Sequence, residues 1–356
     1  MSITSPPPIA RSGVSATAFF GIGLAIAAAF FAALAAAGNG YLFFASYVVL
    51  QFVVLATAWN ILGGYCGYVN FGSAAFFAIG AYTTIFIYVV THEFDKTLIG
   101  GALAAIPAGI LLPLLIALAG VISGLVGLGM GYLTLRLQGV FFSIATLALS
   151  VVLQTFVVNW DLVGGSRGAF VIRPEDFVLP GGTALPGGFV GFLLVLMLLL
   201  AVIAITISRT IERSRLGFGF AAIRDDEVAA EASGVPTLRL KLIATTISGA
   251  LMGMAGATFP YYIGFLEPAS AFGLSYAVNA IAMPMVGGTQ SWIGPLVGAL
   301  LLGTFQQVAT VTISSVLNLL IVGLLLIFFV IAAPNGIVGF FRELKHRRAN
   351  RGDTTP

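Results

Sequence analysis

The chain has 356 residues, of which 59% are hydrophobic and only 8% carry a charge, and its formal net charge is +3. A water-soluble globular domain carries roughly 25% charged residues, so this composition excludes that class and predicts an all-α polytopic membrane protein. The single cysteine, Cys66, excludes an internal disulfide and any metal site built from several cysteines.

Six apolar stretches precede one long charged interruption. A helix that crosses a bilayer needs about 20 apolar residues, so the chain has room for roughly ten crossings plus loops. Residues 1–14 are expected to form a cytoplasmic tail that is retained, although the alanines at 35–37 are similar to a signal-peptide cleavage site. The expected crossings are 15–37, 41–62, 63–90, 98–121, 140–158 and 189–208, with Pro107 and Pro113 as kinks within the fourth.

The third crossing begins with a glycine-rich stretch, 63–72. Non-helical backbone at membrane depth is tolerated only where protein or a water-filled cavity covers it. We therefore expect a broken or re-entrant entry to this crossing. Asn70 and Ser73 share the broken segment, and a half-helix end there could meet the carboxylate of a passing zwitterion. For any one of these polar residues, hydrogen bonding between helices is the more common use.

Residues 209–241 form the longest charged segment of the chain. Six cations lie in it, which by the positive-inside tendency predicts a cytoplasmic location: Arg209, Arg213, Arg215, Arg224, Arg239 and Lys241. Inside it, three acids at 225–227 favour a helix N-terminal turn, small helix formers follow, and a glycine and a proline end the pattern. This short helix, held outside the membrane, is a candidate docking element. Its assigned residues are Arg224, Asp225, Asp226, Glu227, Ala229, Ala230 and Gly234.

Four further crossings follow, at 242–263, 274–286, 295–308 and 317–333. The glycine-rich stretch 286–298 is a second candidate re-entrant segment, and its place resembles that of 63–72, which hints at an internal repeat. Asn279 and Thr289 are further candidates for lining a pathway. Residues 334–356 form a basic tail that favours an anionic lipid surface over nucleic acid. Ten crossings place both termini in the cytoplasm, and 15–333 is the transmembrane domain.

The sequence lacks a nucleotide-binding motif and the motifs of common catalytic sites. A nucleotide-binding loop needs Gly-Lys-Ser/Thr, and none of the three lysines (Lys96, Lys241 and Lys345) follows a glycine. No metalloprotease motif and no catalytic triad can be assembled on one side of the membrane, so we expect no enzyme activity and no cofactor on this chain. No charge falls in the middle of an expected crossing, which disfavours a proton-driven carrier. The remaining interpretation is a passive transport pathway that another subunit drives.

Several motifs together resemble the branched-chain amino-acid permeases of ABC importers, of the LivM type. The similarity extends from about residue 48 to residue 339. The motifs are GYVNFGSAAFFAIGAY (67–82), LRLQGVFFSIATLAL (135–149), GGSRG (164–168), AAIRDDEVAAEASGV (221–235) and VGGTQSWIGPLVGALL (286–301). The chain departs from the family pattern at Ser73, where a histidine is frequent, and at Thr289, where a third glycine is frequent.

The resemblance implies a permease fold and a set of partners. These are two cytoplasmic ATPase subunits that bind the ATP, a homologous second permease, a soluble substrate-binding protein outside, and the lipid of a bacterial inner membrane. The short helix at 225–234 would then be the element that an ATPase subunit grips, with its carboxylates paired to basic groups of that partner. The alternatives are a permease of the same kind for urea or short amides, and a standalone secondary carrier or channel.

Overall fold

The structure is a computed structural model that describes residues 15–93, 106–174, 177, 185–312, 323–324, 327 and 336–340. Within these ranges nine helical segments are long and apolar enough to cross a membrane, and the only strands are two of two residues each. The all-α membrane fold is therefore confirmed. The tenth expected crossing, 317–333, lies outside the described ranges apart from three residues, and both terminal tails lie outside them almost entirely.

The long helices follow the expected order. They are α1 (Ala16–Ala37), α2 (Gly40–Gly63), α3 (Ser73–Glu93), α5 (Ala108–Thr134), α6 (Val140–Val158), α7 (Gly188–Glu212), α10 (Thr237–Ala257), α13 (Leu274–Gly287) and α14 (Ile293–Thr312). The short elements are η1 (Asp161–Val163), η2 (Gly165–Arg167), α8 (Arg215–Asp225), α9 (Glu227–Ala232), α11 (Phe259–Ile263) and α12 (Pro268–Ala271), and β1 (Ala169–Phe170) pairs antiparallel with β2 (Phe265–Leu266).

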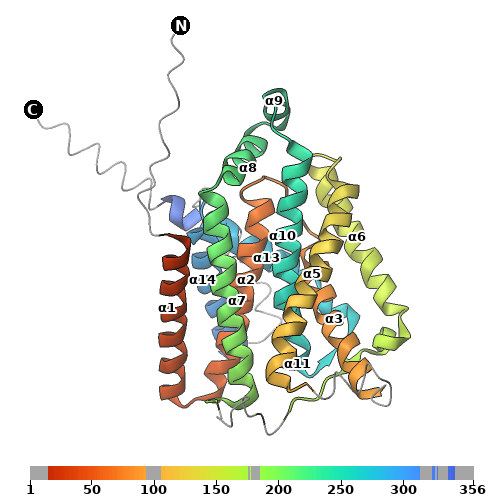
Figure 1. The fold of residues 1–356 in the computed structure, drawn as a ribbon, viewed down its shortest axis with the longest axis vertical. Helices are drawn as coiled ribbons and strands as arrows, with labels where there is room; N and C mark the ends of the chain where they lie inside the picture. Colours follow the sequence, from red (N-terminus) through yellow and green to blue (C-terminus); the bar gives the residue numbers. More distant parts are fainter. Residues whose placement is uncertain are drawn as a thin grey trace, which may run out of the picture.

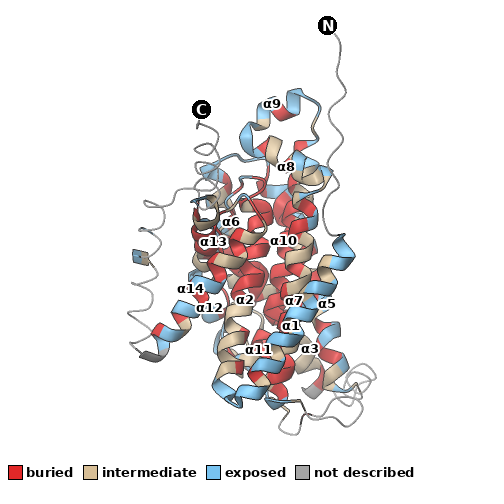
Figure 2. Ribbon diagram, turned by 90° about the vertical axis from the view of Figure 1, so that its left-hand side faces the viewer, coloured by how far each residue is buried: buried red, intermediate tan, exposed pale blue. Residues whose placement is uncertain are grey.

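The core of the bundle is formed by α2, α3 and α10, while α1, α5 and α6 turn apolar side chains outward (Figure 2). Glycines allow α3 and α10 to approach closely. A Cβ on Gly80 would lie 1.9 Å from the carbonyl oxygen of Gly253, and a Cβ on Gly256 would lie 1.9 Å from that of Phe77. Helices in lipid associate through such backbone proximity because the surrounding acyl chains are as apolar as the side chains.

The two ends of the bundle differ. At one end, α8 and α9 extend beyond the long helices, and α1 begins at this end; at the other end lie α11 and the small sheet (Figure 1). The two glycine-rich breaks, 64–72 and 288–292, are both non-helical and lie against each other, since a Cβ on Gly64 would lie 2.7 Å from the carbonyl oxygen of Thr289. The backbone amide of Trp292 bonds to Glu212 at the end of α7, which places both breaks at the end that carries α8 and α9.

Two sequence expectations need correction. The helix described in the fourth crossing, α5, runs from Ala108 to Thr134, beyond the expected end at residue 121, and residues 98–105 lie outside the described ranges. Pro107 is the N-cap residue of α5 and not a kink, whereas Pro113 is inside the helix as expected. A proline costs nothing at a helix start, where the backbone N–H has no helical partner. The charged segment 209–241 is also largely helical, since α7 runs to Glu212, α8 and α9 lie within it, and α10 begins at Thr237.

Candidate functional site

The projecting part of the charged segment consists of two helices rather than one. Ser214 caps α8 by accepting a hydrogen bond from the amide of Leu216, and α8 ends at Asp225. The extended backbone of Asp226 then separates α8 from α9. Sequence reasoning missed α8 because Gly217 and Gly219 lower the helix propensity of its first half. The serine before the apolar run was the available signal.

The boundaries of α9 agree with the expected short helix. Asp226 is its N-cap, with a carboxylate oxygen that accepts a hydrogen bond from the amide of Ala229 at 3.0 Å. Gly234, at φ +83°, ends the element in the left-handed conformation that glycine adopts without strain. The acids therefore start α9 as predicted, except that Asp225 is the last residue of α8.

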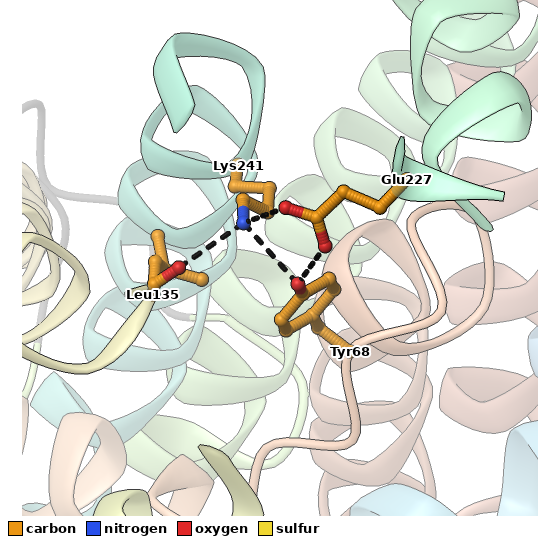
Figure 3. Close-up of polar contacts among 4 residues, drawn as sticks. All are labelled: Tyr68, Leu135, Glu227 and Lys241. Carbon is orange, nitrogen blue, oxygen red and sulfur yellow. Dashed lines mark hydrogen bonds and ion pairs between the residues drawn. The ribbon is translucent and has the colours of Figure 1, made fainter. Parts of the chain in front are cut away.

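Glu227, the first residue of α9, is bonded to the core of the bundle. Its Oε1 lies 2.5 Å from Nζ of Lys241, and its Oε2 accepts a hydrogen bond from the hydroxyl of Tyr68 (Figure 3). The ammonium of Lys241 also donates to the carbonyl oxygen of Leu135 at 3.1 Å and to the Tyr68 hydroxyl at 3.2 Å, so all three of its donors are used. Only 3% of the Lys241 side chain and 16% of that of Glu227 are exposed.

This four-residue cluster joins four separate parts of the chain. Glu227 comes from α9, Lys241 from the first turns of α10, Leu135 from the residue after α5, and Tyr68 from the break after α2. The Tyr68 ring packs edge-on against Phe142 and lies 4.7 Å from the Lys241 ammonium. Removing one partner of a buried ion pair leaves an uncompensated charge and costs about 3–5 kcal/mol, so this junction holds α9 firmly against the bundle.

A second junction lies at the beginning of the charged segment. Glu212, the last residue of α7, accepts a hydrogen bond from the backbone amide of Trp292 at 2.7 Å and a longer one from the hydroxyl of Tyr65 at 3.4 Å. The same Tyr65 hydroxyl lies 2.8 Å from Oγ of Ser208. Tyr65 and Tyr68 both belong to the break after α2, so the two ends of the projecting segment are bonded to one short stretch of backbone.

Between these two tyrosines, α8 packs directly on the break. Gly67 has φ +80°, and a Cβ added to it would lie 3.0 Å from Cγ of Arg224 and 3.4 Å from its Cα. A side chain at this position would meet both backbone strain and the second-to-last residue of α8. Tyr65, Gly67 and Tyr68 therefore contact the end of α7, the end of α8 and the start of α9, respectively.

Three side chains of the break, Tyr65, Cys66 and Tyr68, are buried. Burial raises the pKa of the Cys66 thiol to about 12, an effect that the ammonium of Lys241 opposes and the carboxylate of Glu227 reinforces. Burial likewise raises the pKa of the Tyr65 and Tyr68 phenols, with nearby Glu212 and Glu227 adding to the rise. Both phenols therefore stay protonated and act as hydrogen-bond donors to these carboxylates.

The outer face of α8 and α9 combines charged and apolar residues. The side chain of Asp225 is 73% exposed, and its contact with the adjacent Arg224 at 3.3 Å is a surface ion pair, which is worth about 0–1 kcal/mol. Val228 is 70% exposed and Phe218 60% exposed. The helices that carry them, α9 and α8, extend beyond the long helices (Figure 2). Ala229 is exposed as well. An apolar surface outside the bilayer and rimmed by charge is typical of a protein contact.

Two of the seven predicted docking residues face inward instead. Ala230 is buried, and both oxygens of Glu227 have partners within the chain, whereas Arg224 stays exposed although its stem lies against Gly67. The expected pairing of Glu227 with a basic group on a partner is therefore corrected: its basic partner is Lys241. Lys241 and Tyr68 were not singled out from the sequence. The available signal was that Lys241, one of three lysines in the chain, directly precedes an apolar run.

The four predicted pathway residues do not gather at one place. Asn70 is buried and caps its own turn by accepting from the amide of Gly72 at 2.7 Å, and Ser73, the first residue of α3, has a buried hydroxyl without a hydrogen-bond partner. Thr289 lies in the second break at the same end, whereas Asn279 lies within α13 and accepts a hydrogen bond from Gln306 at 2.8 Å. Their role in a pathway stays a prediction.

Apolar cavities occur elsewhere in the described bundle. One of 410 Å³ is lined by α1, α2 and α14, and one of 370 Å³ by α3, α5 and α6. Both have almost entirely apolar walls, and neither is lined by a predicted pathway residue. Among the described residues, no group of three His, Cys, Asp or Glu side chains could hold a metal ion.

Comparison with known proteins gives several matches. The sequence profile of a family described as "Branched-chain amino acid transport system / permease component" matches residues 41–330. The chain is 27% identical over 314 residues to the high-affinity branched-chain amino acid transport system permease protein LivM of Salmonella typhimurium, which covers 83% of this chain and 69% of that protein.

Two further relatives extend the comparison. The permease protein LivH of the corresponding Escherichia coli K12 system is 23% identical over 298 residues, or 81% of this chain and 91% of that protein. The autoinducer 2 import system permease protein LsrC of an Enterobacter strain is 29% identical over 209 residues, or 57% of this chain and 56% of that protein. No solved structure matches the chain.

Proposed function

Because the chain belongs to the permease family of branched-chain amino acid transport systems, we propose that it is the membrane-spanning subunit of an ATP-driven importer for branched-chain amino acids. The observation that carries the proposal is the pair α8 and α9, which projects beyond the bundle with an exposed surface of charged and apolar residues. The sequence contains no loop for nucleotide phosphates, so the energy for transport comes from a separate subunit that grips this projection.

The proposed assembly contains more than one kind of partner. Two cytoplasmic ATPase subunits hydrolyse ATP, and a soluble binding protein delivers the substrate to the opposite end. The chain is similar to both LivM and LivH, which are named as permease proteins of one kind of transport system. This double similarity supports a related second permease as the partner within the membrane. In this proposal the two permeases together enclose the pathway, with Asn70, Ser73, Asn279 and Thr289 as candidate lining residues.

The proposed orientation follows from charge. Cations at 213, 215, 224 and 239 flank or lie in the projecting segment, and such charges favour the cytoplasmic side of an inner membrane. The first helix begins at the same end (Figure 1), which supports a cytoplasmic N-terminus. With a tenth crossing at 317–333, the basic C-terminal tail reaches the same side.

The first experiment tests the partners by affinity purification. The tagged chain is expressed with its candidate ATPase and second permease and purified in detergent. We expect both to co-purify, and we expect Asp225→Lys to reduce the amount of ATPase because it reverses an exposed charge on the docking surface. Asp161→Lys, a reversal on an exposed residue at the opposite end, is the matched control and should leave the ATPase in place. A complex without any ATPase would overturn the proposal.

The second experiment tests the substrate. The complex and its binding protein are reconstituted in liposomes, and uptake of leucine, isoleucine and valine is measured with and without ATP. We expect uptake to depend on ATP. We also expect that an excess of urea or short amides does not reduce leucine uptake. Uptake without ATP or partners would identify a standalone carrier, and preference for the amides would assign the second substrate class.

A further inference from the structure

We propose that residues 65–68, within the break after α2, receive the motion of the docking helices and pass it into the bundle, with Tyr65 and Tyr68 as the positioning residues. The proposal rests on the proposed function, since it assumes an ATPase that moves α8 and α9. It concerns how the chain responds to that movement. Nothing in the composition or the motifs assigned a role to these two tyrosines.

The first argument is geometric. The projecting segment touches the break at its beginning, its middle and its end, through Glu212 to Tyr65, Arg224 to Gly67, and Glu227 to Tyr68. Three contacts within four consecutive residues join this part of the break to the end of α7, to α8 and to α9. A displacement of α8 and α9 therefore acts on residues 65–68 through these contacts.

The second argument is the strength of the link at its far end. The Tyr68 hydroxyl belongs to a closed hydrogen-bond network. In it, the Lys241 ammonium donates one hydrogen bond each to Glu227, the carbonyl oxygen of Leu135 and the Tyr68 hydroxyl. Hydrogen bonds to charged groups are stronger than those between neutral groups, and burial protects them from competing water. The network is anchored in α10, the helix that packs most extensively against α5, α3 and α2.

The third argument is where the break leads. The carbonyl oxygen of Asn70 accepts a hydrogen bond from the Trp59 indole at 2.9 Å, and α3 begins at Ser73 directly after it. Trp292, which is bonded to Glu212, is the last residue of the second break and directly precedes α14. Movement of residues 65–68 thus reaches the starts of two crossing helices and the end of α2. These crossing helices themselves need not contact the ATPase.

The competing explanation is that these contacts only keep α9 folded. It predicts that weakening them lowers the amount of assembled complex, while each assembled complex still transports normally. The receiving role predicts the opposite: the ATPase still binds the exposed face of α8 and α9 and still hydrolyses ATP, but hydrolysis no longer drives transport.

The test uses the full reconstituted complex and measures substrate uptake and ATP hydrolysis in the same liposomes. We expect Tyr68→Phe, which removes one hydroxyl, to lower uptake per ATP hydrolysed about fivefold, the factor that corresponds to roughly 1 kcal/mol for one hydrogen bond. Lys241→Met should lower it further. The matched control is Tyr132→Phe, whose exposed hydroxyl on α5 bonds only to the Arg136 guanidinium in the described structure, at 3.2 Å.

Cys66 supplies a second readout, because it is the chain's single cysteine and lies in the break. Its rate of labelling by a maleimide should differ between the nucleotide-free complex and the complex trapped with ATP and vanadate. In Lys241→Met this difference should disappear. The proposal is overturned if both variants keep the wild-type ratio of uptake to hydrolysis, or if Tyr132→Phe lowers the ratio equally.

Failure of the proposed function looks different. In that case the wild-type chain itself would bind no ATPase and show no ATP-dependent uptake. Loss of the ATPase from Tyr68→Phe, with an intact wild-type complex, would assign the network to folding of α9 and overturn the receiving role alone.

Discussion

The ammonium of Lys241 lies 2.5 Å from the carboxylate of Glu227, fourteen residues earlier in the sequence, and only 3% of the lysine side chain is exposed. Two helix ends are joined by this contact, one outside the bundle and one inside it. The exposed ion pair between Arg224 and Asp225, in the neighbouring helix, has no such effect, because water solvates both groups. The two pairs differ in burial rather than in chemistry, and the following predictions depend on that difference.

The buried pair should show strong coupling in a double-mutant cycle. We expect Glu227→Gln and Lys241→Met each to lower the free energy of unfolding by about 3–5 kcal/mol, because each leaves a buried partner unpaired. The double variant should lose clearly less than the sum, since no lone charge remains. Thermal unfolding in detergent provides the measurement. Strictly additive losses would show that the two side chains do not interact.

Gly67 and Gly139 form a matched pair for testing the contact with α8. Both have positive φ, but a Cβ on Gly67 would lie 3.0 Å from Cγ of Arg224, whereas a Cβ on Gly139 would have no heavy atom within 4 Å. Alanine at either position should cost about 1–2 kcal/mol of stability through backbone strain. Only Gly67→Ala should also lower uptake per ATP hydrolysed. Equal uptake ratios in the two variants would contradict a tight contact between α8 and the break.

The raised pKa of Cys66 makes stability depend on pH in the alkaline range. The thiol ionises near pH 9 in the unfolded chain and near pH 12 in the folded one, so the folded state holds the proton more tightly. Its contribution is fully present below about pH 9 and declines as pH rises toward 12. We expect Cys66→Ser to flatten the loss of stability between pH 9 and 11, as followed by thermal unfolding at several pH values.

Alkylation gives a direct check on the same pKa. Because the thiolate is the reactive form, the labelling rate in the folded protein should still rise between pH 9 and 11, whereas in denaturant it should level off there. If the labelling rate of the folded protein levels off near pH 9, the thiol is solvated. The conclusion that Cys66 is buried away from water would then be wrong.

The cap of α9 is open to test by hydrogen exchange. Asp226 accepts a hydrogen bond from the amide of Ala229, and replacing such a cap with alanine costs about 1 kcal/mol of helix stability. We expect Asp226→Ala to speed exchange of the amides in 229–234 roughly fivefold. Asp225→Ala, the preceding exposed acid, makes no cap to α9 and serves as the control. Equal exchange in both variants would mean that α9 does not depend on its cap.

Hydrophobic patterning was sufficient to predict the helical membrane fold. Apolar runs of about 20 residues can satisfy their backbone groups in lipid only as helices, so the order of the nine described spans follows from the hydrophobic pattern. The two breaks at 64–72 and 288–292 were also predictable, because glycines cluster there. The pattern missed α8, because its glycines lower the predicted helix propensity. It also missed that Pro107 caps the start of α5, because that proline was interpreted as a kink.

The candidate site was predictable only in part. The acids, small residues and terminating glycine indicated α9 and its cap correctly, since capping acts over three or four residues and is written in the local sequence. The same local pattern could not tell that Glu227 faces the bundle while Asp225 faces water. That distinction depends on where α10 and the break after α2 lie relative to α9.

The sequence by itself determined that the chain is embedded in a membrane, how its helices are spaced, and that a charged, capped projection interrupts them. These properties depend on neighbouring residues and on the solvent, and both act over short stretches of chain. Only the tertiary structure decided that Tyr68, Leu135, Glu227 and Lys241 meet. Their hydrogen bonds span up to 173 residues of sequence, and a buried charge finds its partner through packing in space, which no local pattern encodes.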